Sequence, residues 1–565
     1  MSIILGLNIS GFHSSAAIIS NGSIKAAITE ERLSRIKSDK SFPKKAILNC
    51  CKIAGISISE ISDIYIGWNP AYYLFNSNGN LQDSFNDRGK LIYSSVKEIS
   101  SLLDDPKIKI QQEIQALGTN FKIHYVDHHL AHLSNSFLQS KFPKSDFLVA
   151  DGFGETKSGI VGTINMDSIN TISSFRTPHS LGSFYSTFTQ FLGFNPNEDE
   201  WKVMALASLG DPKKEYKKIK NLICVNELNF ELDLSFFEHF LFFTKNYFSP
   251  KFIETFGTPL KDNKLNQYHY NLVASVQKVV EESCFEILNN LQKLTKSNKL
   301  VLSGGAFMNS VMNGKLIENT NYEEVYIGGS PDDSGISTGS ALYGCVYDKK
   351  GKININSKNQ NYFGNEYSDQ DIMDELNKRK INFKKIENIE SYTAKLINQN
   401  KILAWFQGRS EFGQRALGNR SILANPKAVN IKEKVNSSIK YRESFRPFAP
   451  SIIKESQNDY LIILNDQNSY FMERVFTFKK EFWEKLPGVV HYNGTGRLQT
   501  VSIETNPKFY NLIREFEKLS GFPIILNTSF NVNGMPLVET PGDALDCFYM
   551  SGIDYLVLNN FIVSK

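Results

Sequence analysis

The chain has 565 residues, of which 41% are hydrophobic and 22% are charged, and both values are ordinary for globular proteins. They exclude a disordered or low-complexity protein, and the length allows three or four small domains or two large ones. The formal net charge of +4 is too small to indicate a nucleic-acid-binding protein by itself. No apolar run approaches the ~20 residues that span a membrane, so we expect no membrane association.

The six cysteines are scattered and contain no CxxC pair. This usage favours buried thiols in a reducing compartment over a disulfide framework. The first residues lack the basic region and cleavage site of a signal peptide. We therefore expect a cytoplasmic protein.

Apolar runs alternate with short polar loops along the N-terminal part of the chain. Residues 3–7 and 16–19 predict two buried strands, and Asn21-Gly22 is a strong two-residue hairpin signal that leads into a third strand, Ile24 to Ile28. Three later apolar runs each enter a loop rich in Gly or Asp; they are residues 147–150, 300–302 and 325–327. This pattern predicts an α/β domain with ligands at the carboxyl ends of its strands.

The composition turns to Asn, Ser, Gln, Gly and Tyr from about residue 351 to 370. We take this stretch as a boundary between two domains, 1–355 and 356–565. Residues 402–406 then open a second αβ region. The basic run 213–220 has helical periodicity, and a solvated helix face is favoured there over a site for a polyanion.

Three of the nine histidines lie within His128-His129-Leu130-Ala131-His132. On a helix, His128 and His132 share one face and are able to turn toward one ion, whereas His129 points elsewhere. A structural pair of histidines is the alternative. Asp151 and Asp333 each lie in a Gly-bounded loop at a strand end, where either is alternatively a simple turn residue. Together the four predict a mixed N/O site suited to iron, manganese or zinc.

Two Gly-containing turns are candidate phosphate-binding loops. Ser303-Gly304-Gly305 and the residues to Asn309 lie between a strand and a predicted helix, where backbone N–H groups suit phosphate oxygens; a tight turn is the alternative. The turn from Leu7 to Ser15 is a second candidate. Its His13 is either a general base or an exposed bystander.

Cations are densest between residues 408 and 450. Arg409, Arg415 and Arg420 lie among glycines, and they are followed by Lys440, Arg442 and Arg446. Guanidinium groups bind phosphates and carboxylates in a bidentate manner, so this segment predicts a pocket for a small, highly anionic substrate. The later run Leu526 to Asn531 offers amide and hydroxyl groups at another strand end, or forms a turn.

Taken together, these segments resemble the O-carbamoyltransferases typified by nodulation protein U and by the cephamycin and tobramycin carbamoylating enzymes. The resemblance covers nearly the whole chain in motif order. Its motifs are EER with Lys37 and Phe42-Pro43, HHLAH, DGFGE, EWKVM, SGGAFMN, the 331–335 loop, GQRALGNRSIL, RPFAPS, Gly494-Thr495 with Arg497, and NTSFN.

The resemblance implies two α/β domains: an N-terminal actin-like (ASKHA) domain similar to threonylcarbamoyl transferases and a C-terminal YrdC-like domain. The second would form carbamoyl-adenylate from ATP and carbamoyl phosphate, with Mg²⁺ accompanying ATP. Residues matching its phosphate and carbamoyl positions are Arg415, Arg420, Lys440, Arg446, Thr528 and Ser529, with Arg415 and Lys440 taken as catalytic. In the first domain, the metal ligands would be His128, His132, Asp151 and Asp333, with Fe²⁺ the expected ion and Mn²⁺ or Zn²⁺ the alternatives; Gly304, Gly305 and Asn309 would hold nucleotide, and His13 would deprotonate the acceptor.

The expected reaction transfers a carbamoyl group to a hydroxyl of a sugar, antibiotic or glycan, and the labile intermediate requires a closed internal route between the domains. The alternative acceptor is a hydroxymethylated base, 5-hydroxymethylcytosine, in DNA. A non-catalytic scaffold and an actin-like sugar kinase are disfavoured because every expected charge is present and the Arg-rich segment needs explanation. A homodimer is left open. The chain departs from the family pattern at Ser14, Ser208-Leu209, Gln414 and Met535, and the first two suggest an unusual acceptor.

Overall fold

The computed structural model describes residues 3–69, 112–114, 116–117, 121–241, 245–261, 264–354, 360–443 and 446–565. The chain forms two compact units. Unit 1 contains residues 1–23, 40–43 and 56–355, and unit 2 contains residues 24–39, 44–55 and 356–565. The predicted boundary between residues 355 and 356 falls within 355–359, outside the described residues.

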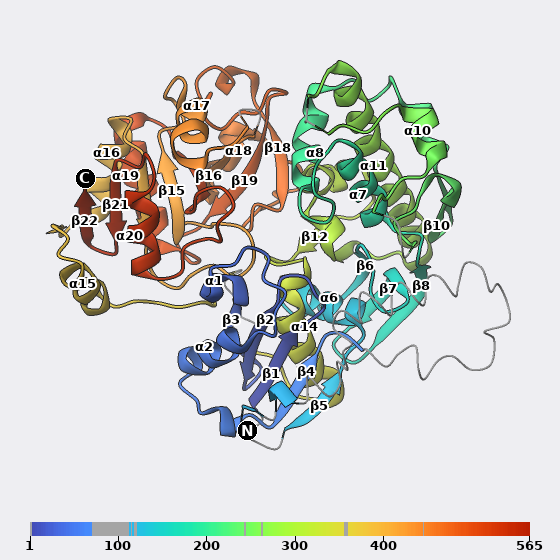
Figure 1. Cartoon of the computed structure of the whole chain (residues 1–565), viewed down its shortest axis with the longest axis horizontal. Helices are drawn as coiled ribbons and strands as arrows, with labels where there is room; N and C mark the ends of the chain where they lie inside the picture. The colour runs from blue at the N-terminus through green and yellow to red at the C-terminus, as the bar shows by residue number, and fades with distance from the viewer. Residues whose placement is uncertain are drawn as a thin grey trace. The chain divides into compact units, whose positions relative to one another are not determined.

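Two mixed sheets form the framework of unit 1 (Figure 1). In the first, strands run in the order β2-β1-β4-β5, and β1 is antiparallel to β2 but parallel to β4. The second has the order β12-β11-β6-β7-β8, and β9 pairs with β10 separately. The bounds are β1 Ile3–Asn8, β2 Ser15–Ser20, β4 Asp63–Ile66, β5 Lys122–Tyr125, β6 Lys144–Ala150, β7 Lys157–Asn165, β8 Ile169–Arg176, β9 Ile223–Asn226, β10 Asn229–Leu232, β11 Lys299–Ser303 and β12 Glu324–Ile327.

These bounds confirm the strands predicted at residues 3–7, 16–19, 147–150, 300–302 and 325–327. The two-residue turn at Asn21-Gly22 is confirmed as well, because β2 ends at Ser20 and β3 begins at Ser23. Both turn residues have positive φ, 52° and 68°, as a tight hairpin turn requires.

The helices of unit 1 are α6 His128–Phe137, α7 Leu181–Phe191, α8 Glu200–Leu206, α9 Tyr216–Lys220, α10 Pro250–Phe256, α11 Gln267–Thr295, α12 Ser310–Gly314, α13 Leu316–Asn319 and α14 Ile336–Tyr343. The basic run is helical as predicted, over α9. Its charges are partly paired, since Lys218 Nζ lies 2.7 Å from Glu215 Oε2. No helix among the described residues is long and apolar enough to cross a membrane.

Helix α14 packs closely against both β1 and α6. A Cβ at Gly6 of β1 would lie 1.8 Å from the Ser337 carbonyl oxygen of α14, and a Cβ at Gly339 of α14 would lie 1.9 Å from the Ala131 carbonyl oxygen of α6. Any side chain at either glycine would therefore push the elements apart. This close packing fixes α6, with its histidines, beside the start of α14.

A ten-stranded sheet dominates unit 2, in the order β13-β22-β21-β14-β15-β20-β16-β19-β18-β17 (Figure 1). Its strands are β13 Lys384–Lys385, β14 Leu403–Phe406, β15 Arg420–Ala424, β16 Ala449–Ile453, β17 Leu461–Ile462, β18 Arg474–Phe478, β19 Thr495–Val501, β20 Ile524–Ser529, β21 Tyr555–Leu558 and β22 Phe561–Ser564. Parallel and antiparallel neighbours alternate irregularly, since β14 is parallel to β21 and antiparallel to β15.

Helices cover both faces of this sheet, so its strands are apolar on both sides. Ala404 and Phe406 of β14 pack in one core with residues of α15, α17 and α20, whereas Leu403 and Trp405 pack in another with residues of α16 and α19. The bounds are α15 Asp369–Lys378, α16 Ile389–Asn398, α17 Ile431–Val435, α18 Gln457–Tyr460, α19 Pro507–Ser520 and α20 Pro541–Tyr549. The structure thus confirms the mixed α/β class and a separate C-terminal sheet domain.

An N-terminal segment also belongs to unit 2. It contains most of β3 (Ser23–Thr29), α1 (Glu30–Ser34) and α2 (Lys44–Ala54). The backbone N–H of Ala27 donates to the carbonyl of Phe363 at 3.2 Å. Unit 2 is therefore built from both halves of the sequence.

Asp63 of β4 supplies a test of electrostatics within unit 1. Its buried carboxylate accepts hydrogen bonds from Lys349 Nζ at 2.7 Å and from His124 Nε2 at 2.9 Å. Burial would raise its pKa, but hydrogen bonds from Lys349, Ser62 and His124 outweigh this effect and lower the pKa to about 2. Because the folded-state pKa lies below the unfolded value, the ionised group stabilises unit 1 above about pH 4.

We predict that Asp63→Asn lowers the free energy of unfolding by about 1–2 kcal/mol at pH 6, the magnitude being limited by the partly exposed partners. The difference from wild type should shrink as the pH falls from 4 toward 2, where wild type itself becomes protonated. Denaturant titrations of both proteins at a series of pH values measure it. A difference that stays constant over this range would contradict the prediction.

Candidate functional site

The four predicted metal ligands of unit 1 converge. His128 and His132 lie one turn apart on α6, Asp151 directly follows β6, and Asp333 begins the short turn before α14. His132 Nε2 lies 2.9 Å from Asp151 Oδ2 and 3.4 Å from Asp333 Oδ1. The corresponding distances from His128 Nε2 are 3.3 and 3.7 Å. One ligand atom from each residue lies within 4.8 Å of all the others.

The charges of this cluster suit a cation. Burial opposes protonation of His132, but Asp151 and Asp333 outweigh it and raise the pKa of His132 to about 10. The same imidazoles hold the pKa of the Asp151 carboxyl well below its usual range, against the effect of burial. Two carboxylates and two neutral imidazoles provide oxygen and nitrogen ligands. A divalent ion bound to them would replace the protons on the imidazoles. The residues therefore fit Fe²⁺, Mn²⁺ or Zn²⁺.

The turn between β1 and β2 touches this cluster. Ser10 Oγ donates to Asp333 Oδ2 at 2.8 Å, and Asn8 Nδ2 donates to the carbonyl oxygens of Phe12 and His13 at 2.6 and 3.2 Å. His13, the predicted general base, is half-buried and has φ 45°. Sequence reasoning missed Ser10, for which only its place in the turn was a signal.

The predicted glycine loop also borders the metal cluster. Gly304 has φ +96°, and a Cβ there would lie 2.2 Å from the Ala150 carbonyl oxygen; a Cβ at Gly305 would lie 2.8 Å from Asp151 Oδ1. Only glycines permit this close approach. Asn309 caps α12, accepting from Met312 N at 3.1 Å, and exchanges two amide hydrogen bonds with Gln277 of α11. The helix expected after the loop is confirmed as the five-residue α12.

Lys440 of unit 2 lies against the end of the Asn527-Thr528-Ser529 segment. It ends a π-helical turn, Asn436–Lys440, and is 2% exposed. Its ammonium donates to the Ser529 carbonyl and to Ser529 Oγ at 3.1 Å, and to Asn531 Oδ1 at 2.8 Å. Thr528 and Ser529 end β20, and both are half-buried.

Like charges gather around Lys440. Burial, Arg442 and Arg446 hold the pKa of Lys440 well below its usual range. Burial and Arg446 lower the pKa of Arg442 to about 10, and burial with Arg415 and Arg442 depresses the pKa of Arg497. We call Arg415, Lys440, Arg442, Arg446 and Arg497 the cation cluster. Such mutual repulsion is relieved by a bound anion.

Arg420, the remaining predicted phosphate-binding residue, is held by the backbone of unit 2. It is 0% exposed, and its guanidinium donates to the carbonyl oxygens of Gln407, Gly408 and Asn419, and of Asn365 at 3.1 Å. It stacks on Phe406, with Cζ 3.6 Å from the ring centroid. These contacts show a residue that holds strands and loops together, and its role toward phosphate stays a prediction.

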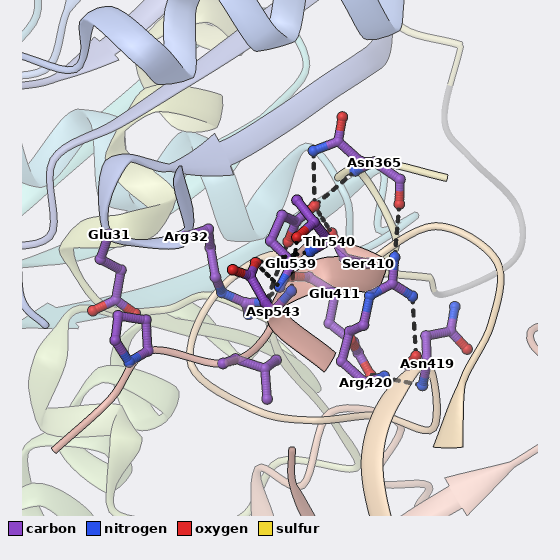
Figure 2. A network of polar contacts seen from close by, with 12 residues as sticks. Glu31, Arg32, Asn365, Ser410, Glu411, Asn419, Arg420, Glu539, Thr540 and Asp543 are labelled. Atoms are coloured by element: carbon purple, nitrogen blue, oxygen red, sulfur yellow. Dashed lines mark hydrogen bonds and ion pairs between the residues drawn. The ribbon is translucent and has the colours of Figure 1, made fainter. Parts of the chain in front are cut away.

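Two buried carboxylates, Glu411 and Glu539, organise the loops near Arg420 (Figure 2). Glu411 Oε1 accepts from the backbone N–H groups of Leu417, Asn419 and Arg420 at 2.7, 2.8 and 3.1 Å, so the loop with Arg415 is closed around it. Glu539 Oε1 accepts from Ser410 Oγ at 2.8 Å and from Asn365 N and Nδ2 at 3.1 and 2.9 Å.

Helix α1 supplies the counter-charges. Arg32 NH1 lies 3.6 Å from Glu539 Oε2, and its NH2 donates to the carbonyl oxygens of Glu411 and Gly413. Arg35 donates to the carbonyl oxygens of Pro536 and Leu537. Sequence reasoning missed Glu411, Glu539 and Arg497 as site residues; only the position of Arg497 after a Gly-Thr pair was noted.

Known protein families also match this chain in two parts, one N-terminal and one C-terminal. A carbamoyltransferase N-terminus family model matches residues 3–342, and a carbamoyltransferase C-terminus model matches residues 394–565. Nodulation protein NolNO of Sinorhizobium fredii is 32% identical over 97% of this chain and 78% of its own length. Nodulation protein NolO of Bradyrhizobium diazoefficiens is 32% identical over 78% of this chain and 79% of its own length. An uncharacterized Synechocystis protein is 31% identical over 100% of this chain and 97% of its own length.

Solved structures are more distant. A full-length HypF in the phosphate- and nucleotide-bound form has 16% identity and a TM-score of 0.31, over 60% of this chain and 55% of its own.

The Arg32–Glu539 pair provides a test of how α1 is attached to unit 2. We predict that Arg32→Met destabilises unit 2 by about 3–5 kcal/mol, because it leaves a buried carboxylate without its cation. The double variant, Arg32→Met with Glu539→Gln, should lose less free energy of unfolding than the two single variants lose together. Hydrogen–deuterium exchange of β14 and β15 in the full chain measures these changes.

Lys37→Met is the matched control, since it also removes a cation next to a glutamate. Lys37 is 44% exposed in its bond to Glu31, so its loss should cost about 0–1 kcal/mol. Equal effects of Arg32→Met and Lys37→Met would contradict the buried ion pair.

Proposed function

Because the chain belongs to the carbamoyltransferase family and is a carbamoyltransferase, we propose that it is an ATP-dependent O-carbamoyltransferase with carbamoyl-adenylate as its intermediate. The observation that supports this most directly is the cation cluster of unit 2. Three of its five cations have pKa values lowered by burial and by neighbouring cations, a setting that suits a compact polyanion, and ATP with carbamoyl phosphate supplies one.

In unit 2, carbamoyl phosphate would be hydrolysed to carbamate and phosphate, and a carbamate oxygen would then attack the α-phosphorus of Mg²⁺-bound ATP. The bond to the β-phosphate oxygen breaks, and pyrophosphate leaves. Arg415 and Arg497 would balance the charge of the phosphates, and Lys440 would hold the carbamoyl group beside Thr528 and Ser529. Fixed cations of this kind stabilise a transition state without reorganisation.

In unit 1, the acceptor hydroxyl would attack the carbamoyl carbon, and AMP would leave. His13 would accept the hydroxyl proton, while Gly304, Gly305 and Asn309 would hold the nucleotide. A divalent metal on His128, His132, Asp151 and Asp333 would supply Lewis acidity when bound. We propose accordingly that unit 1 has the actin-like fold of threonylcarbamoyl transferases and that unit 2 is YrdC-like.

A small alcohol is the proposed acceptor. The basic helix α9, the motivation for a DNA acceptor, has part of its charge neutralised by Glu215, and no other described feature favours nucleic acid. The two departures that suggest an unusual acceptor, Ser14 and Ser208-Leu209, are both in unit 1: Ser14 is buried and Ser208 donates to the Ala205 carbonyl at 2.8 Å. They support an acceptor that differs from those of the family's typical members.

The two half-reactions can be separated by mutation. Arg415→Ala should lower pyrophosphate release that depends on both ATP and carbamoyl phosphate by about 10²-fold or more, because a transition-state cation is lost. His132→Ala should retain this release but lose carbamoyl transfer. Labelled ATP, with pyrophosphate and AMP measured separately, distinguishes the steps.

Arg514→Ala is the control for the first variant, because it removes a cation of unit 2 from a surface helix. It should leave pyrophosphate release unchanged. Undiminished release by Arg415→Ala would show that the assignment of the adenylation site is wrong.

The acceptor is tested by mass spectrometry of a panel of alcohols incubated with ATP and carbamoyl phosphate. The panel contains an aminoglycoside, a lipochitooligosaccharide, a nucleoside and 5-hydroxymethylcytosine DNA. We expect the added mass of one carbamoyl group on a small alcohol, at a rate that does not depend steeply on salt. Modification of the DNA alone, with strong salt dependence, would contradict a small-alcohol acceptor.

A further inference from the structure

His129, the histidine of the HHLAH segment outside the first cluster, belongs to a second cluster. Asp127, His129 and Glu155 each place one ligand atom within 4.8 Å of the other two. Residues 128 and 132 share one face of α6, and residue 129 is turned about 100° away from 128. The rings of His128 and His129 are nearly perpendicular, at 88°, with centroids 5.4 Å apart. The helix therefore presents imidazoles to two distinct places.

The imidazole of His129 is the observation that points to a ligand. It is 0% exposed, and neither ring nitrogen has a hydrogen-bond partner among the described residues. A buried polar group without a partner costs about 1–3 kcal/mol. The carboxylates that face it, Asp127 and Glu155, are 17% and 2% exposed. A cation between the three would satisfy a ring nitrogen and both carboxylates.

Gly154 leaves room for the imidazole of His129. A Cβ at Gly154 would lie 2.5 Å from His129 Cε1 and 2.9 Å from Nδ1, so only glycine at position 154 lets the imidazole take this place. The carboxylates are already oriented by other bonds. Asp127 Oδ1 accepts from the backbone of His129 and Leu130, and Glu155 accepts from the backbone of Asn69 and His128.

We propose that Asp127, His129 and Glu155 bind a second divalent cation, of the Zn²⁺, Mn²⁺ or Fe²⁺ class. One nitrogen and two carboxylate ligands suit these ions, and water would complete the coordination. Because both carboxylates also accept N–H groups at the first turn of α6, this cation fixes the end of the helix from which His128 projects. It is a positioning cation, and the inference does not depend on the proposed acceptor or on the adenylate.

Lys157 would compete with a bound cation for the carboxylate of Asp127. Its ammonium lies 3.1 Å from Asp127 Oδ2 and is the cation that now faces this carboxylate. A divalent ion must displace it or share the carboxylate with it. Removing Lys157 therefore strengthens cation binding, whereas it would leave a merely structural cluster short of positive charge.

The test is the metal content and metal affinity of the full chain. Metal-free protein is titrated with Zn²⁺, Mn²⁺ or Co²⁺ alone by calorimetry, and bound metal is counted by elemental analysis after gel filtration. We expect two equivalents for wild type, one for His129→Leu and one for His132→Ala. For Lys157→Met we expect at least tenfold tighter binding of the second equivalent. With Co²⁺, two visible spectra should appear, and each single variant should lose a different one.

Asp127→Asn separates binding from folding, because asparagine caps a helix as well as aspartate does. It should keep the helix content but weaken the second equivalent more than tenfold. One equivalent in saturated wild type, two equivalents in His129→Leu, or an unchanged affinity in Lys157→Met would each overturn the proposal.

Discussion

The loops of unit 2 depend on two carboxylates that are buried away from water, Glu411 and Glu539. A buried carboxylate is stable only when hydrogen bonds and a nearby cation replace its hydration. Glu411 meets this requirement with the backbone N–H groups of Leu417, Asn419 and Arg420, which closes the loop of Arg415 around it. Glu539 meets it with Asn365, Ser410 and Arg32. The shape of the loop that carries Arg415 follows from the bonds to Glu411.

The two units have opposite electrostatic needs. In unit 1, carboxylates and imidazoles are packed without enough positive charge, so that protons are held tightly on His132. In unit 2, burial and neighbouring cations lower the pKa values of Lys440 and Arg497, so that protons are held less tightly there. Each arrangement is costly by itself and becomes favourable when its missing partner binds. The proposed reaction, with a divalent metal in unit 1 and ATP in unit 2, would use both kinds of site.

Local patterns were enough to predict the elements and one of the sites. Apolar runs bounded by Gly or Asp identify β1, β6 and β11, and helical spacing with strand-end loops predicts that His128, His132, Asp151 and Asp333 meet. Burial of Arg420 could not be predicted, because one of its carbonyl partners, Asn365, lies 55 residues away in the sequence. Nor did any pattern link Arg32 to Glu539, since the EER motif names no partner for Arg32 and Glu539 lies outside the motifs. The same holds for His129, whose partners depend on the rotation of α6.

The bonds of α1 also bear on how the protein is made. Arg35 lies 502 residues from Leu537, its hydrogen-bond partner. At ~5–20 residues per second, a ribosome needs roughly 25–100 s to synthesise the intervening chain. Throughout that time Arg35 lacks the carbonyl oxygens of Pro536 and Leu537, and Arg32 lacks the carboxylate of Glu539. An early-translated helix thus completes its contacts only when translation is almost over, and a nascent chain that stalls before this point leaves it unattached.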